Sequence, residues 1–111
     1  MARILIIAPD SELRKSMEFA LSVEGHEITT RASIGAHERP GYDCTIVDQH
    51  GIGTNVAAAV SFCTIFEPVV LLTSQLPHPL SPIVHATLLK PLLGAALVAA
   101  VNASIGAASP K

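Results

Sequence analysis

The chain has 111 residues, which is enough for one domain spanning residues 1–111 with a single hydrophobic core. Half of the residues are apolar and 14% are charged, a balance that excludes an intrinsically disordered protein. The formal net charge is −2 and aromatic residues make up 4%, which argues against nucleic-acid binding by phosphate neutralisation or base stacking. No apolar run is long enough for a membrane span or a secretory signal, so we expect a cytoplasmic protein and no membrane partner.

The first 25 residues predict a strand followed by a helix. Residues 3–8 are an apolar run typical of a strand buried on both faces, and Pro9 ends it. Asp10 or Ser11 can cap the helix that follows, whose apolar residues recur at helical spacing. Gly25 supplies the end of that helix.

The next segments are shorter. Residues 26–31 predict a second strand, which is more polar and therefore expected near the edge of the sheet. A weak helical segment over 33–39 precedes a third strand over 44–47. Residues 49–53 contain two glycines and predict a loop.

A helix is predicted over 55–66 and a fourth strand over 69–72. The stretch over 74–82 contains three prolines, so a regular helix cannot run through it, and 83–86 can form one turn at most. The fourth helix of an alternating α/β fold should therefore be reduced or absent.

The chain closes with a very short fifth strand over 87–89 and a last helix from 92 to about 105. Residues 106–111 have the composition of a frayed tail or a linker. Strand and helix alternate five times and the strands are apolar on both faces, which predicts a parallel sheet covered by helices on both sides.

Three of the apolar strand-like runs end in one polar residue each, namely Asp48, Thr73 and Lys90. In parallel sheets, ligands and chemistry gather at the carboxyl ends of the strands. We therefore expect these three side chains to converge in one pocket although they are far apart in the sequence. Lys90 would then place a positive charge beside Asp48.

The motifs ILIIAPDSELR, YDCTIVD, PVVLLTS and LLKPL stand in an order that resembles the receiver domain of two-component response regulators (CheY-like), over nearly the whole chain. The resemblance implies a flavodoxin-like, doubly wound five-stranded parallel sheet. It also implies that Asp48 matches the residue that accepts phosphate from a histidine kinase. Thr73 then matches the phosphate-sensing hydroxyl residue, and Lys90-Pro91 matches a Lys-Pro pair in which Pro91 follows a cis bond.

Two positions depart from the receiver pattern in a way that bears on function. Ala8 and Pro9 stand where the family has two acids that bind Mg²⁺, and Asp10 matches only the variable residue after them. Thr87 stands where a switch aromatic usually precedes the lysine. The chain therefore resembles a degenerate receiver, or pseudo-receiver, whose metal-binding half is missing.

The missing acids favour a function without phosphorylation. Phosphoryl transfer to a carboxylate brings two anions together and needs positive charge, and Asp48 alone is a poor site for Mg²⁺, which demands near-octahedral oxygen ligands. We expect a phosphorylation-independent module of a two-component or phosphorelay system, without a cofactor, that binds a signalling protein such as a histidine kinase or phosphotransferase. The alternative is a phospho-accepting receiver that uses Asp48 with Asp10 as a residual Mg²⁺ ligand.

Other readings of individual residues are simpler. Asp10 is expected to cap a helix more readily than to bind metal, and Cys44 and Cys63 are expected to be buried, reduced thiols. No nucleophile elbow, phosphate-binding glycine loop or pair of catalytic acids indicates an enzyme, a class that we rank last. The Ala-rich last helix has a small-residue face, and a homodimer through it is a further expectation.

Overall fold

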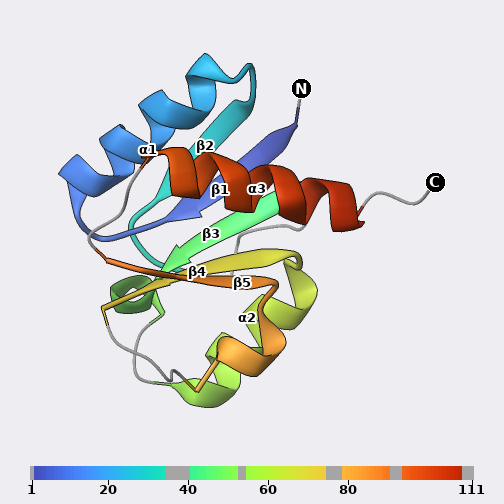
Figure 1. The fold of residues 1–111 in the computed structure, drawn as a ribbon. Coiled ribbons are helices and arrows are strands. Elements are labelled where there is room, and N and C mark those ends of the chain that lie inside the picture. The colour runs from blue at the N-terminus through green and yellow to red at the C-terminus, as the bar shows by residue number, and fades with distance from the viewer. Residues whose placement is uncertain (1, 35–40, 53–54, 75–78, 91–93, 109–111) are drawn as a thin grey trace.

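The computed structural model describes residues 2–34, 41–52, 55–74, 79–90 and 94–108 (Figure 1). Within these ranges, strands and helices alternate along the chain. The strands are β1 (Arg3–Ile7), β2 (Glu27–Arg31), β3 (Cys44–Asp48), β4 (Val69–Thr73) and β5 (Ala86–Leu89). The α-helices are α1 (Ser11–Val23), α2 (Val56–Ile65) and α3 (Gly94–Ala108), and the two short 3₁₀ turns are η1 (Gln49–Gly51) and η2 (Ser81–Ile83).

The five strands form one parallel sheet in the order β2-β1-β3-β4-β5, which confirms the predicted doubly wound architecture. β2 is an edge strand, as its polar composition predicts. Figure 1 shows α1 and α3 on one face of the sheet and α2 on the other. The chain winds in opposite directions from β1 and from β3, so the carboxyl ends of these two strands flank the crevice where sites form in such folds.

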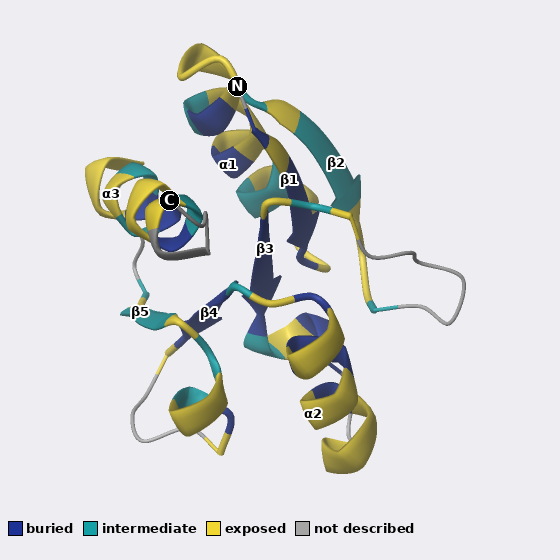
Figure 2. Cartoon of the chain, turned by 90° about the vertical axis from the view of Figure 1, so that its right-hand side faces the viewer, coloured by how far each residue is buried: buried dark blue, intermediate teal, exposed yellow. Residues whose placement is uncertain are grey.

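The core consists of two apolar layers, one on each face of the sheet. Successive side chains of a strand point to opposite faces, so Ile4 and Ile6 pack toward α1 and α3 while Leu5 and Ile7 pack toward α2. All four are fully buried, and each such side chain contributes about 1.5–3 kcal/mol to folding. The burial colours of Figure 2 show that β1, β3 and β4 carry most of this core.

Helix α1 begins and ends as its sequence predicts. The Asp10 carboxylate accepts hydrogen bonds from the backbone N–H groups of Glu12, at 2.9 Å, and Leu13, at 3.3 Å. The helix ends before Gly25, whose φ of 89° lies in the left-handed region that favours glycine. Asp10 is thus the helix cap, as predicted.

The segment between β4 and β5 holds one correction. The sequence allows one turn at most over 83–86, whereas the turn in the structure lies earlier, at Ser81–Ile83, and includes Pro82. Proline fits the first turn of a helix, where its missing N–H has no partner to lose. Ala86 then joins β5 by pairing with Val70. Among the described residues of this segment η2 is the one helical turn, in keeping with a reduced fourth helix.

The predictions for the last helix and for a helix over 33–39 have different outcomes. The last helix continues to Ala108, so the expectation that the tail begins at residue 106 is wrong for its first three residues. Gly106 costs about 1 kcal/mol relative to alanine in a helix, but the two alanines after it are the strongest helix formers and continue the Ala-rich helix. The helix predicted over 33–39 lies largely outside the described residues, although Ser33 and Ile34 are described and are not helical. Pro91 and residues 109–111 also lie outside them.

Helices α2 and α3 are unusual because neither contains a charged residue. Figure 2 shows the outer side of α2 exposed to solvent. Val56, the first residue of α2, is 60% exposed. None of the described helices has the length and hydropathy that a membrane span requires.

Both cysteines are buried and unpaired with each other, and their chemistry can be tested directly. Burial raises the pKa of the Cys44 thiol to about 12 and also raises the pKa of Cys63, because a thiolate is poorly solvated in the core. We expect the folded chain to resist a disulfide reagent such as Ellman's reagent at pH 8. In urea, the unfolded chain should react fully and release one equivalent of thionitrobenzoate from the reagent per cysteine.

The same pKa shifts predict how stability depends on pH. A thiol with a raised pKa keeps its proton in the folded state, so its contribution to stability is complete below the unfolded pKa of about 9. The free energy of unfolding should fall as the pH rises above 9, because only the unfolded chain then loses these protons. If either cysteine of the folded chain reacted with Ellman's reagent as fast as it does in urea, the burial of both thiols would be contradicted.

Candidate functional site

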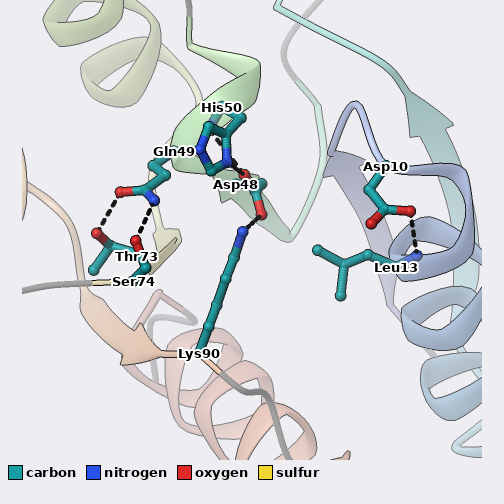
Figure 3. A network of polar contacts seen from close by, with 8 residues as sticks. All are labelled: Asp10, Leu13, Asp48, Gln49, His50, Thr73, Ser74 and Lys90. Carbon is teal, nitrogen blue, oxygen red and sulfur yellow. Dashed lines mark hydrogen bonds and ion pairs between the residues drawn. The ribbon is translucent and has the colours of Figure 1, made fainter.

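Asp48 occupies the centre of the site, at the carboxyl end of β3. It is 1% exposed, which is rare for a carboxylate without compensating partners. Its Oδ1 atom accepts a hydrogen bond from the backbone N–H of His50 at 2.8 Å. The Nδ1 atom of the His50 imidazole lies 3.1 Å from the same oxygen. Its Oδ2 atom forms an ion pair with the ammonium group of Lys90 (Figure 3). Both carboxylate oxygens are therefore engaged.

Lys90 reaches this position because it directly follows β5. Its backbone N–H donates to the carbonyl of Thr73 at 2.9 Å, which ties the end of β5 to the end of β4. Its side chain is 25% exposed, whereas the side chain of Asp48 is 2% exposed. The predicted pairing of Asp48 with Lys90 is thus confirmed.

Thr73, the third predicted residue, lies at the carboxyl end of β4 and is fully buried. Its hydroxyl donates to the side-chain carbonyl of Gln49 at 2.6 Å. The Nε2 group of Gln49 donates in turn to the hydroxyl of Ser74 at 2.8 Å. Figure 3 shows the amide of Gln49 facing both hydroxyl groups.

The positions of the missing acids lie on the other side of the crevice. Ala8 is fully buried and Pro9 is exposed, and neither side chain offers an oxygen. The guanidinium of Arg14 donates to the carbonyl of Ala8 at 2.7 Å and to the carbonyl of Pro9 at 3.1 Å. A positive charge therefore occupies the edge of the sheet where the receiver family has two negative ones.

These groups do not fit a Mg²⁺ ion. Mg²⁺ needs hard oxygen ligands, with one or two carboxylates among them. Arg14 holds the two loop carbonyls, and its guanidinium repels a divalent metal. Lys90 holds one oxygen of Asp48, but it matches a lysine of the receiver pattern and so does not by itself set this site apart. Among the residues that the structure describes, no three side chains of His, Cys, Asp or Glu gather in a group that could hold a metal ion.

Asp10, the weak candidate for a metal ligand, is not brought into the pocket. Figure 3 shows its carboxylate turned toward the first turn of α1, across the crevice from Asp48. One of its oxygens is already taken by the two backbone N–H groups that it caps. His50 also contacts the site, since its Nδ1 atom lies 3.1 Å from Oδ1 of Asp48.

Sequence reasoning missed two residues of this site. Arg14 carried a signal, because a cation in the first turn of a helix is disfavoured by the helix dipole and calls for a local partner. Here the partner is the pair of carbonyls at the end of β1. Gln49 carried no signal, since a glutamine in a glycine-containing loop looks like any solvated side chain.

Comparison with known proteins gives one relative of nearly equal length. The transcriptional regulator protein FixT of Rhizobium meliloti is 34% identical over 108 residues, which cover 95% of this chain and 94% of that protein. No family model matches the chain.

Solved structures show where the fold belongs. The receiver domain of the Francisella response regulator 1452 superposes with a TM-score of 0.80 at 15% identity, covering 98% of this chain and all of that one. The non-phosphorylated HemR receiver domain from Leptospira biflexa gives 0.78 at 14% identity, over 100% and 99% of the two chains. Full-length FixJ from B. japonicum gives 0.74 at 20% identity, over 98% of this chain and 60% of that one. These structures share the fold.

Proposed function

Because this chain belongs to the response regulator receiver family, we propose that it serves two-component signalling as a pseudo-receiver, a protein-binding module that works without phosphorylation of Asp48. One observation carries the proposal: the guanidinium of Arg14 is bound to the carbonyls of Ala8 and Pro9, where receivers have their acid pair. The acid pair that would bind a metal is absent, and the positively charged guanidinium of Arg14 lies at that place instead.

The state of Asp48 is consistent with the same proposal, although the lysine beside it also belongs to the receiver pattern. A carboxylate that attacks a phosphoryl donor must leave its partners and approach a second anion. Asp48 is instead buried, paired with Lys90 and hydrogen-bonded to the backbone of His50. In this arrangement the Asp48–Lys90 pair joins the ends of β3 and β5 and keeps the pocket in one form.

The partner that we propose is a histidine kinase or a phosphotransferase, the class of protein that receivers meet in two-component systems. The FixT protein is named a transcriptional regulator. With a net charge of −2, this chain would influence transcription through a protein partner rather than through DNA. The surface that we assign to output begins at Ser74, which follows β4, and includes η2. A cytoplasmic location, the absence of enzymatic activity and a homodimer through α3 remain predictions.

A phosphorylation assay tests the proposal. The chain is incubated with acetyl phosphate and Mg²⁺, and its intact mass is recorded beside that of an active receiver treated in the same way. We expect the active receiver to gain a labile phosphate and this chain to gain none. A labile phosphate that Asp48→Ala abolishes would overturn the proposal and establish the alternative, a phospho-accepting receiver.

A further inference from the structure

A closed set of contacts joins the carboxyl ends of three strands. Asp48 pairs with Lys90, Lys90 donates from its backbone to Thr73, and Thr73 donates from its hydroxyl to Gln49, which directly follows Asp48. Ser74 extends the set through its bond to Gln49. Figure 3 shows the side chains of this set gathered between η1 and the ends of β4 and β5.

We propose that Gln49 is a positioning residue that stands in for a phosphoryl group as the partner of the Thr73 hydroxyl. In the receiver pattern, that hydroxyl senses a phosphate on the acceptor aspartate. Here the Gln49 amide supplies the acceptor permanently, so the end of β4 is held in one arrangement without modification. This inference rests on the proposed function, because it explains how a pseudo-receiver keeps a fixed output surface.

The geometry of the amide suits this role. A primary amide offers an acceptor oxygen and a donor nitrogen side by side, and both are used, at 2.6 Å to Thr73 and at 2.8 Å to Ser74. Thr73 is fully buried, so its hydroxyl cannot exchange Gln49 for water without opening the pocket. A phosphoryl group on Asp48 would have to break this bond in order to engage Thr73.

The position of Gln49 explains how the bond reaches the output surface. Thr73 is the last residue of β4, and its carbonyl accepts the backbone N–H of Lys90 at 2.9 Å. Holding the Thr73 side chain therefore also holds the junction of β4 with β5. Ser74, the first residue beyond β4, is held by the same amide.

The test compares Gln49→Met, which keeps the length of the side chain but removes both polar groups, with Gln49→Glu, which keeps the acceptor for Thr73. NMR reads the hydrogen exchange of the Lys90 amide and the relaxation dispersion of the Thr73 methyl group. We expect Gln49→Met to speed exchange at Lys90 about fivefold, as loss of one hydrogen bond implies, and to give the Thr73 methyl a second conformation. In Gln49→Glu, the exchange rate at Lys90 and the single conformation of the Thr73 methyl group should stay as in the natural chain. Amides of β1 serve as the internal reference for general destabilisation.

Thr73→Val, which keeps the shape of the side chain and removes the hydroxyl, completes the experiment. Combined with Gln49→Met it should add less to the exchange rate than it does alone, since the bond between the two side chains is already lost. Unchanged exchange and a single methyl conformation in Gln49→Met would overturn the inference and leave the proposed function standing. A labile phosphate on Asp48 of the natural chain would instead overturn the proposed function, whatever the Gln49 variants show.

Discussion

Replacing Lys90 with methionine is expected to lower the free energy of unfolding by about 3 kcal/mol. The cost arises because Asp48 is 1% exposed and would be left buried without the cation that pairs with it. Removing one partner of a buried ion pair costs about 3–5 kcal/mol, and the lower end applies because a quarter of the lysine side chain is exposed. Urea denaturation followed by circular dichroism measures the change, with the slope expected to stay constant.

Two further variants separate the ion pair from a general effect of losing a lysine. Lys15 is an exposed residue of α1, and Lys15→Met should change stability by no more than about 0.5 kcal/mol. Adding Asp48→Asn to Lys90→Met should recover most of the loss, because the buried charge is then removed together with its partner. If Lys90→Met were as stable as Lys15→Met, the ion pair would have no structural role.

The central strands were predictable from sequence because burial on both faces leaves an unbroken apolar run. Runs over 3–8, 44–47 and 69–72 match β1, β3 and β4 within one residue at each end. The ends of the irregular segments were not predictable in the same way. The position of η2 depends on where Leu80, which is 2% exposed, packs against α2, and that choice is made by tertiary contacts rather than by local pattern.

Part of the candidate site was likewise predictable from sequence and part was not. Asp48, Thr73 and Lys90 were predictable because strand ends in a parallel sheet converge at one edge, whatever their distance in sequence. Their hydrogen-bond partners were not, since Gln49 and Arg14 reach the site from a turn and a helix through rotamers that only packing selects. Strand topology thus places the charges of this pocket, while the side chains of the connecting segments decide what those charges do.

Restoring the acids is expected to produce a metal site where the natural chain has none. The variant combines Ala8→Asp and Pro9→Asp with Arg14→Gln, which removes the guanidinium from the two loop carbonyls. Two new carboxylates, those carbonyls and Asp48 then offer the hard oxygen ligands that Mg²⁺ requires. We expect calorimetry to show saturable Mg²⁺ binding in the low millimolar range. At about ten times the Kd, Mg²⁺ should raise the free energy of unfolding by roughly 1.4 kcal/mol.

Control variants with and without Arg14→Gln show how far this guanidinium opposes Mg²⁺ binding. The acids without Arg14→Gln should bind Mg²⁺ more weakly, because the guanidinium pairs with the new carboxylates, and Arg14→Gln without the acids should not bind it at all. Ala8 is fully buried, so a carboxylate there costs stability, and Pro9→Asp with Arg14→Gln, which changes an exposed position, provides a milder acid variant. Saturable Mg²⁺ binding by the natural chain, at the affinity of the acid variants, would mean that Asp48 holds the metal despite both cations. The charge inversion at the end of β1 would then not be what separates this chain from a phosphorylated receiver.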